Sequence, residues 1–427
     1  MLSISRFCAA NSVRLIYPHT KPLFTTTPTV FSTTVRRELC RLSSPKNTIF
    51  SKLKLPRLYS SASVPIRLKS SNVEKYKKVV GYWLCTCSGM VFVAVILGGV
   101  TRLTEAGLSM VTWKLLGEKM PRTQEEWQAE FEKYKQFPEF QVQRRDMTLS
   151  EFKWIWHMEY GHRMWGRAIG AVFLLPATYL WIKGAFAKPM KIRVFAFGSL
   201  ILAQGLMGWY MVRSGLENKF EGESDVVRVS QYRLASHLGL AFVLYSLLLW
   251  SSLDHLLPAQ TLSTVNENII KSARKFRMFA HSCKGMVFFT AVSGAFLAGL
   301  DAGLVYNSFP KMADRWIPDD ILAHKPVLVN LTENPTTVQF DHRILGVTTL
   351  ALISTLWVLS KRRVLPPRAY VATTALASMA WIQVVLGITT LLMYVPVWAA
   401  ASHQSGSLVV LSTAVWLTHE LKRLPKI

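Results

Sequence analysis

The sequence predicts an all-α polytopic membrane protein with eight transmembrane helices, arranged as two parallel four-helix-bundle repeats. Three observations support this prediction: a low share of charged residues, eight long apolar runs, and motifs that occur twice in the same order. Half of the 427 residues are hydrophobic and only 18% are charged, whereas soluble domains carry about a quarter charged residues. The low charge indicates a chain whose surface lies largely in lipid.

The first 73 residues are predicted to be a mitochondrial transit peptide. They are rich in Ser and Thr, lack the central apolar run of a secretory signal, and contain a single acid, Glu38. Twelve Lys and Arg less that acid give +11 of the total charge of +25, which leaves +14 for the remainder. Because much of the positive charge belongs to this leader, we expect no nucleic-acid partner. The alternative is a disordered basic tail in another compartment.

Eight apolar runs are long enough to cross a hydrocarbon core about 30 Å thick, which needs about 20 largely apolar residues per helix. They lie near residues 79–100, 162–183, 192–212, 234–252, 278–299, 342–360, 370–393 and 398–418. The first four runs define a predicted amino-terminal repeat at 74–252. A matrix linker at 253–277 and a carboxy-terminal repeat at 278–427 follow.

The connectors between these runs alternate in charge, and Lys and Arg remain on the side from which insertion occurs. One set of connectors and tails is strongly basic: Lys75, Lys77, Lys78, Lys183, Lys188, Lys191, Arg193, Lys271, Arg274, Lys275, Arg277, Lys361, Arg362, Arg363, Arg368, Lys422, Arg423 and Lys426. The other set, at 101–161, 213–233 and 301–341, carries mixed or acidic charge. The pattern predicts a multi-pass protein of the mitochondrial inner membrane with both mature termini in the matrix.

Four motifs of the first half return in the second half in the same order. The pairs are GHRMWG at 161–166 with DHRILG at 341–346, Ala-Ser-His at 235–237 and 401–403, Gln-x3-Gly at 204–208 and 383–387, and EAGL at 105–108 with DAGL at 301–304. Each half holds four helices, an even number, so both copies enter the membrane in the same direction. The repeats are therefore parallel.

Four histidines belong to this repeat, and each is expected at the start of a transmembrane helix, near the intermembrane space. They are His162, His237, His342 and His403. Ionisable side chains at this depth are costly and are therefore functional candidates. One such histidine would more often be a packed polar residue, but two duplicated pairs favour ligands. Five other histidines lack counterparts and are interpreted as ordinary loop or interfacial residues: His157, His255, His281, His324 and His419.

Two histidines per half, on separate helices, could bracket a metal from opposite sides. Zinc needs three or four protein ligands, and no Cys or acid is repeated to complete such a set. A porphyrin iron already has four nitrogens and needs only two axial imidazoles. We therefore predict one haem per half, with the four histidines as axial iron ligands. Small residues near them would leave room for the flat macrocycle: Gly166, Gly170, Gly346, Gly406 and Ser407.

Charged neighbours of the histidines are further candidates. Arg163 and Arg343 could pair with haem propionates, or could instead reach the lipid headgroups. Glu159 lies three residues before His162, whereas Gln339 holds the matching place in the second half. A carboxylate beside only one haem suggests a catalytic role, in which it accepts a proton or stabilises a developing cation. The alternative is an ion pair between Glu159 and Arg163.

The sequence also resembles the mitochondrial haem A synthases, the inner-membrane enzymes that turn haem O into haem A for cytochrome oxidase. The resemblance covers roughly residues 75–420. It rests on GGVTRLTEAGLSM at 98–110, EYGHR at 159–163, ASH at 235–237, DAGLVYNSFPKM at 301–312, DHR at 341–343 and SHQ at 402–404. Two departures are Ala106, where the family often has Ser, and the lack at 101–161 of the cysteine pair found in bacterial relatives.

The resemblance implies a division of labour between the halves. His162 and His237 would hold the substrate haem O, with Glu159 near the reacting C8 methyl group, which becomes a formyl group. His342 and His403 would hold a resident haem b that relays electrons. A mitochondrial ferredoxin would be the electron donor, haem O synthase would supply the substrate, and cytochrome oxidase assembly factors would be partners. A homo-oligomer is compatible with the sequence.

Two other classes of protein share some of these features. A two-haem cytochrome b that carries electrons or reduces quinone would need the four histidines, but it would not need Glu159 or consume haem O. A transporter built from parallel repeats would explain the symmetry but not the paired histidines. The haems bound by the purified protein would separate the enzyme from both alternatives.

Overall fold

A computed structural model describes residues 70–217, 226–258, 260 and 266–423 of the chain, and the elements found there are helices and turns. The predicted transit peptide lies outside the described residues except at its last positions, which begin the first helix, α1 (Ser70–Leu103). The predicted matrix linker is also described only in part.

Each predicted apolar run corresponds to one long helix. In chain order these are α1, α3 (Leu149–Ile182), α4 (Lys188–Leu216), α5 (Gln231–Leu256), α6 (Glu267–Gly299), α8 (Pro335–Ser360), α9 (Pro367–Leu392) and α10 (Val397–Glu420). Within the described residues, all of these except α10 are long and apolar enough to cross a membrane. The predicted all-α polytopic membrane fold is confirmed.

Several helices begin well before the apolar runs that predicted them. The Thr148 side chain accepts a hydrogen bond from the Glu151 N–H, and the Glu151 carboxylate accepts one from the Thr148 N–H, so α3 starts there. His162 therefore lies more than three turns inside α3 rather than at its start. Asn334 caps α8 in a similar way.

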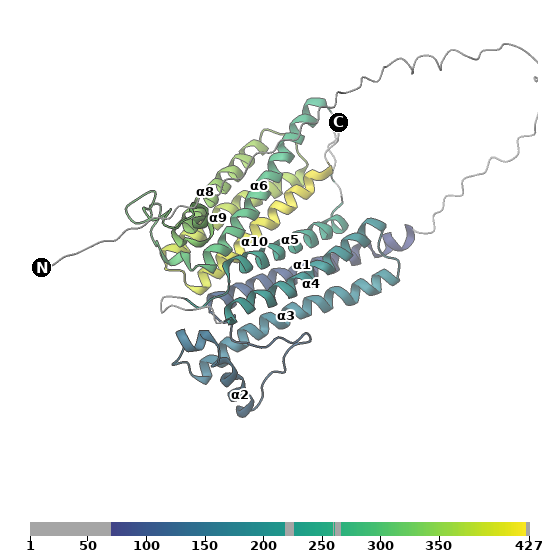
Figure 1. Cartoon of the computed structure of the whole chain (residues 1–427). Helices are drawn as coiled ribbons and strands as arrows, with labels where there is room; N and C mark the ends of the chain where they lie inside the picture. Colours follow the sequence, from purple (N-terminus) through teal and green to yellow (C-terminus); the bar gives the residue numbers. More distant parts are fainter. Residues whose placement is uncertain (1–69, 218–225, 259, 261–265, 424–427) are drawn as a thin grey trace, which may run out of the picture. The chain divides into compact units, whose positions relative to one another are not determined.

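The long helices pack as two sets of four. In the first half α1 packs against α3 and α5, and α4 packs against the same two helices. In the second half α8 and α10 both contact α6 and α9. Figure 1 shows the two sets side by side, and they meet through α1, α5, α6 and α10.

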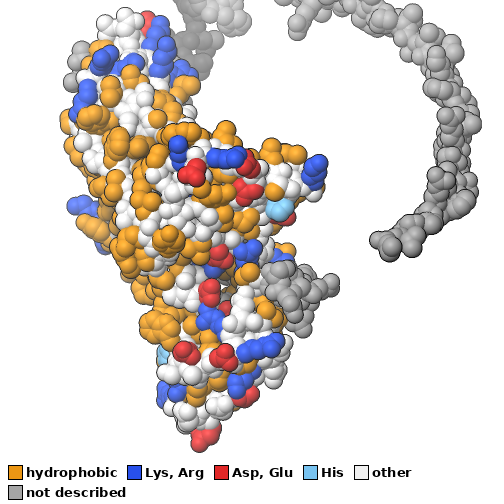
Figure 2. Space-filling model, turned by 90° about the vertical axis from the view of Figure 1, so that its left-hand side faces the viewer, with side chains coloured by type: hydrophobic (Ala, Val, Ile, Leu, Met, Phe, Trp, Pro, Cys, Tyr) orange, Lys and Arg blue, Asp and Glu red, His pale blue; other side chains and the backbone are white. Residues whose placement is uncertain are grey.

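The outer surface suits a lipid environment. Large apolar side chains on the long helices are exposed, among them Leu175, Ile182, Phe195 and Leu202. Figure 2 shows apolar side chains over much of one face, with groups of charged side chains between them. Single exposed apolar residues are ordinary, but their spread along several helices indicates contact with hydrocarbon.

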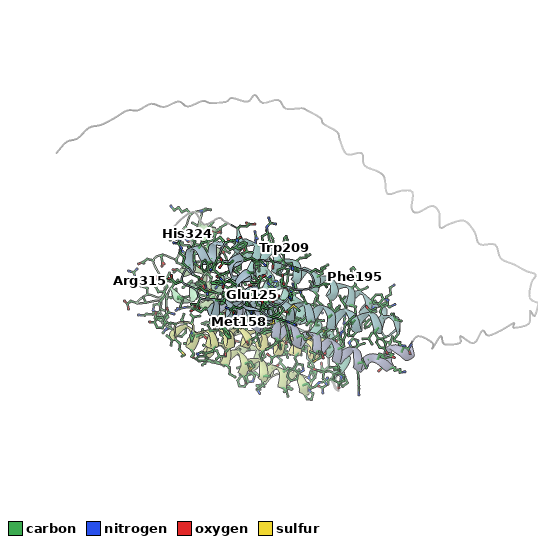
Figure 3. All side chains as sticks on the ribbon, turned by 90° about the horizontal axis from the view of Figure 1, so that it is seen from below. Glu125, Met158, Phe195, Trp209, Arg315 and His324 are labelled. Carbon is green, nitrogen blue, oxygen red and sulfur yellow. The ribbon has the colours of Figure 1, made fainter. Side chains whose placement is uncertain are left out.

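Shorter elements occupy the connectors at one end of the helices. The first connector holds α2 (Gln124–Tyr134) and a π-helical turn, η1 (Glu139–Gln143), and the later one holds η2 (Ala302–Leu304), η3 (Val327–Val329) and α7 (Asn330–Glu333). A short turn, η4 (Leu421–Arg423), follows α10. In Figure 3, His324 and Arg315 of the later connector lie toward one end, and Phe195 of α4 lies toward the other.

Candidate haem sites

A cavity of about 1360 Å³ extends into both halves of the described protein. The four repeated histidines line it from α3, α5, α8 and α10, and most of its other lining residues are apolar. Of the other histidines in the described ranges, none lines this cavity. The structure thus brings the four predicted ligands to one internal space.

Each of the four imidazoles lies against a glycine on the preceding long helix. An added Cβ at Gly98 would be 2.9 Å from Cε1 of His162, and at Gly387 it would be 2.7 Å from Cε1 of His403. The corresponding separations are 3.4 Å for Gly208 with His237 and 3.3 Å for Gly294 with His342. Since real Cβ atoms almost never approach within 3.0 Å, Gly98 and Gly387 fix the places of their histidines.

The two carboxy-terminal imidazoles have a spacing that suits two axial ligands. The ring centroids of His342 and His403 are 6.4 Å apart, and the ring planes are at 85°. Two metal–nitrogen bonds of about 2 Å each account for most of the distance between the centroids. The distance from each ring nitrogen to its own ring centroid accounts for the rest. This pair therefore fits one iron atom between its members.

The Nδ1 atoms of the histidines have different surroundings in the two halves. The Ser293 hydroxyl is 2.7 Å from Nδ1 of His342, and Nε2 of Gln383 is 3.1 Å from Nδ1 of His403. By contrast, Nδ1 of His162 and of His237 is buried with no hydrogen-bond partner among the described residues. Buried polar atoms without partners are costly, so polar neighbours hold the carboxy-terminal imidazoles more firmly than the amino-terminal ones.

Small residues line the cavity largely as predicted. Gly166, Gly170 and Gly346 face open space, because an added Cβ at any of them would meet nothing within 4 Å. Gly406 is an exception, since a Cβ there would lie 2.2 Å from Oε1 of Gln383. That glycine permits close packing of α10 against α9 rather than leaving room for a macrocycle.

Glu159 is buried in α3 and is held by three donors. Arg163 donates to Oε1 at 2.5 Å, while the Ser109 hydroxyl and the Met110 N–H donate to Oε2 at 2.8 and 2.7 Å. The ion pair between Glu159 and Arg163 is thus present, and both side chains are almost fully buried. Glu159 also lines the cavity, so its carboxyl group is held in a fixed position at the cavity wall.

Gln339 occupies the equivalent place in α8 and makes a similar but neutral set of contacts. Its Nε2 donates to the carbonyls of Ala302 and Tyr306, and its Oε1 accepts from Arg343 at 3.1 Å. Both halves therefore use an arginine, four residues further along the helix, to hold the connector that follows the first helix of the repeat. The two sites differ in charge and in the direction of their hydrogen bonds, because Glu159 accepts from its connector whereas Gln339 donates to carbonyls of its connector.

The two arginines, Arg163 and Arg343, donate most of their hydrogen bonds to backbone carbonyls of the connectors. Arg163 donates to the carbonyls of Met110 and Thr112, both at 2.7 Å, and Arg343 donates to the carbonyl of Tyr306 at 2.9 Å. Both line the cavity, and in both the Nε is buried with no partner in the described part of the chain. Contact with a propionate stays a prediction.

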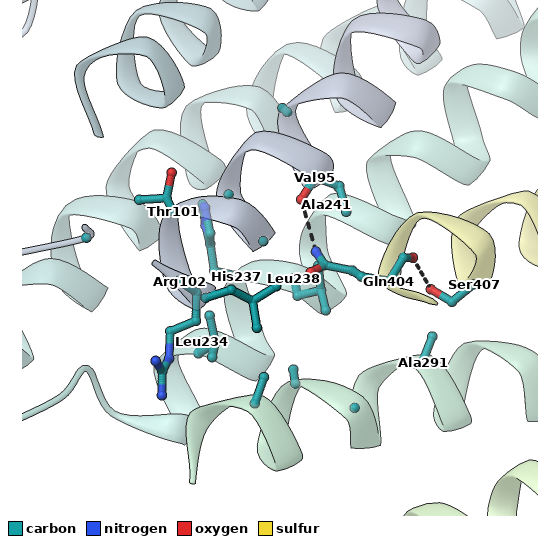
Figure 4. A pocket seen from close by; sticks show the side chains of 18 of the residues that line it. Val95, Thr101, Arg102, Leu234, His237, Leu238, Ala241, Ala291, Gln404 and Ser407 are labelled. Carbon is teal, nitrogen blue, oxygen red and sulfur yellow. Dashed lines mark hydrogen bonds between the residues drawn. The ribbon is translucent and has the colours of Figure 1, made fainter. Parts of the chain in front are cut away.

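Polar contacts join the halves across the cavity wall. Gln404 of α10 donates to the Val95 carbonyl of α1 at 2.9 Å, as drawn in Figure 4, where His237 and Arg102 are also labelled. Arg102 forms an ion pair with Asp301 at 2.8 Å. The two halves therefore share one wall of the cavity.

Sequence reasoning missed Glu139, a buried carboxyl group of η1 that also lines the cavity. It accepts a hydrogen bond from the Tyr134 hydroxyl at 2.9 Å. Burial raises the pKa of Glu139 to about 7, and the positive charge of Arg144 opposes that rise. Glu139 has no partner in the repeat, so the sequence carried no signal for it. Ser293 was missed for the same reason.

Comparison with known proteins places the chain in a family. Residues 81–415 match the family described as cytochrome oxidase assembly protein. Relatives named Heme A synthase COX15 include one from Homo sapiens, 58% identical over 351 residues, which are 82% of this chain and 84% of that protein. Another from Arabidopsis thaliana is 43% identical over 367 residues, 85% of this chain and 79% of that protein.

A bacterial relative from Nitrosospira multiformis, named Heme A synthase, is 42% identical over 348 residues, which are 81% of this chain and 94% of that protein. These matches span the long helices of both halves. The chain therefore belongs to the cytochrome oxidase assembly protein family.

Proposed function

We propose that this protein is a haem A synthase, an oxidoreductase that converts the C8 methyl group of haem O to a formyl group and so supplies haem A for cytochrome oxidase. The names of its relatives support the reaction. The four cavity histidines support two axially ligated haems. The observation that carries the assignment within the chain is that a buried acid, Glu159, contacts the arginine four residues later in one half, whereas the neutral Gln339 makes the equivalent contact in the other half.

In this proposal the amino-terminal half binds the substrate. His162 and His237 hold the haem O iron, and Glu159 is the catalytic residue beside the reacting methyl group. Because Arg163, Ser109 and Met110 anchor its carboxylate, we assign Glu159 the stabilisation of developing positive charge rather than proton transfer by a moving side chain. The neutral Gln339 could not supply this charge in the other half.

The carboxy-terminal half would hold the resident cofactor, haem b, through His342 and His403. When bound, haem b supplies one-electron transfer to the substrate site. The protein's part is to hold both imidazoles at the observed spacing and to exclude water with apolar walls. A mitochondrial ferredoxin is the proposed electron donor.

We also propose the mitochondrial inner membrane as the location, with both mature termini in the matrix. The basic connectors support this orientation through the positive-inside rule. Protease treatment of mitoplasts should spare a carboxy-terminal tag, and cleavage of the tag without access to the matrix would contradict the orientation.

Chromatography of the haems extracted from purified protein tests the proposed function. A haem A synthase should contain haem O or haem A beside haem b. A two-haem electron carrier should contain haem b alone, and a transporter should contain no stoichiometric haem. The second or third result would overturn the proposal.

A further inference from the structure

The environment of His342 fixes which of its nitrogens carries the proton. Ser293 of α6 lies 2.7 Å from Nδ1 of His342 and also donates to the Thr290 carbonyl at 2.7 Å. A hydroxyl has a single proton, and a carbonyl can only accept. The Ser293 proton therefore points to Thr290, and its oxygen accepts from Nδ1–H of His342. Nε2 of His342 is left with a lone pair for a metal.

The equivalent place in the first half cannot make this bond. Gly98 and Gly294 both lie against the first histidine of their half, and the EAGL and DAGL motifs have the same spacing from these glycines. This register aligns Ser293 with Leu97, which has no polar side-chain atom. Consistent with that, Nδ1 of His162 is buried without a partner among the described residues.

The second histidine of each half shows a similar difference, because Nδ1 of His403 has a polar neighbour whereas Nδ1 of His237 has none among the described residues. Gln383 touches Nδ1 of His403 and also donates to its carbonyl at 2.7 Å. Gln204 donates only to the carbonyl of His237, at 3.1 Å, and Nδ1 of His237 has no partner in the described ranges. Because an amide can donate or accept at Nδ1 when its end group turns, the tautomer argument rests on Ser293 alone.

We propose that Ser293 is a positioning residue that makes the His342 site a site of retained haem, and that Leu97 leaves the His162 site free to exchange its haem. Partners that hold the far nitrogen of a ligating histidine fix its orientation and increase its basicity, and their loss costs about 10- to 100-fold in metal affinity. A resident cofactor requires such a partner. A haem that must enter as substrate and leave as product is better served without one. This inference rests on the proposed assignment of haem b to the carboxy-terminal half.

The test compares haem loss from purified full-length variants in detergent, with excess apomyoglobin as the acceptor of released haem. Ser293→Ala should release haem b about 10- to 100-fold faster than the unsubstituted protein. Its haem b reduction potential should also rise, because the imidazole becomes a weaker electron donor to iron. Ser293→Thr keeps the hydroxyl and should restore both properties. Ser282→Ala is the matched control, since Ser282 lies on the same helix and, among the described residues, its hydroxyl bonds only to the Met278 carbonyl.

Unchanged haem b retention and potential in Ser293→Ala would overturn the proposal. If Ser293→Ala does not fold, Leu97→Ser gives a second test, because a hydroxyl beside His162 should slow the release of haem O or haem A. An unchanged release rate in Leu97→Ser would likewise contradict the inference. The identity of the released haem, read by chromatography, separates the two sites. Absence of haem b from the unsubstituted protein would instead contradict the proposed function itself.

Discussion

Among the glycines beside the four histidines, Gly387 is the position where an added methyl group should most reduce haem binding at the candidate site. We expect Gly387→Ala to lower bound haem b, because its Cβ would lie 2.7 Å from Cε1 of His403 and must displace the imidazole or separate α9 from α10. Overpacking of this kind costs roughly 1 to 3 kcal/mol. Absorption spectra per folded protein measure the loss. Gly285→Ala in α6 is the control, since its Cβ would meet nothing within 4 Å. Equal haem b contents in the two variants would contradict this role.

Glu159→Gln tests whether the one charge that distinguishes the halves takes part in chemistry. The substitution keeps the shape of the side chain and removes its charge. We expect haem to bind through His162 and His237, while the conversion of haem O to haem A is largely lost. Haem content and haem A yield should be measured together, per folded protein.

A purely structural role for Glu159 predicts the reverse order of effects. Removing one member of a buried ion pair costs roughly 3 to 5 kcal/mol, so the variant would be scarce and poor in haem before its activity could be affected. Near-normal haem A production by well-folded Glu159→Gln would refute the catalytic role. Glu125→Gln, at an exposed site on α2, controls for the loss of a carboxylate elsewhere.

Glu139 gives the protein a pH dependence of stability. Burial raises its pKa from 4.5 to about 7, so between these values the folded state keeps a proton that the unfolded state has released. The free energy of unfolding therefore falls as pH rises through this window. Glu139→Gln removes this contribution, and its melting temperature relative to the unsubstituted protein should be higher at pH 8 than at pH 5. A difference that does not change with pH would contradict the buried carboxyl.

At the scale of single residues, repetition decided what the sequence could predict. The four histidines and Glu159 were found because they recur or differ between the halves, and Gly166, Gly170 and Gly346 were found by their spacing from these histidines. Ser293 and Glu139 carry no such mark, since their importance comes from contacts across helices. The sequence also did not predict that the connector would fold back so that Ser109 and Met110 bind the carboxylate of Glu159.

Among the helices, α10 differs most from an ideal membrane span. It is the one long helix in the described chain that does not meet the length and composition criteria for crossing a membrane. It packs against α1, α5, α6 and α9, so most of its surface faces protein. A helix enclosed in this way can carry a polar segment at 403–407 that is buried or half-buried, whereas Ser402 is exposed.

Helix starts were the least accurate part of the sequence prediction. Apolar runs locate the part of a helix in the hydrocarbon core, but caps such as Thr148 and Asn334 lie in polar sequence several turns earlier. The connector predicted at 101–161 was given no internal structure. There α2 is identifiable in retrospect by the capping box of Thr123 and Glu126.

The helix α2 packs against α3 next to the part of the connector that binds Glu159. Loss of this packing should have a measurable effect on the connector. Phe131 of α2 is buried and stacks on Phe152 with ring centroids 4.9 Å apart. The same cluster contains Met110, whose N–H binds Glu159. Phe131→Ala should destabilise this packing by roughly 3 to 5 kcal/mol, expose the connector to limited proteolysis and lower the haem A yield.

Val142→Ala is the matched control for that experiment, because the Val142 side chain in the same connector is 48% exposed and does not line the cavity, so its truncation should change little. Equal proteolysis of the two variants would show that α2 does not hold the connector in place.

For the whole molecule, duplication with divergence is the organising feature. Both halves repeat the same four-helix packing, the same glycine beside each histidine, and the same arginine beneath the first connector. They differ at Glu159 and Gln339, and at Leu97 and Ser293. The sequence repeat predicted the architecture because two copies share one set of packing constraints. It could not predict the shared cavity wall, which depends on contacts such as Gln404 with Val95 across the halves.

The central claim is that the two halves hold different haems. Chromatography of the haems retained by His162→Ala and by His342→Ala, each purified and compared with the unsubstituted protein, tests it most directly. We expect His162→Ala to lose haem O and haem A while keeping haem b, and His342→Ala to lose haem b. Equal loss of every haem in both variants, or loss of haem b from His162→Ala alone, would contradict the account.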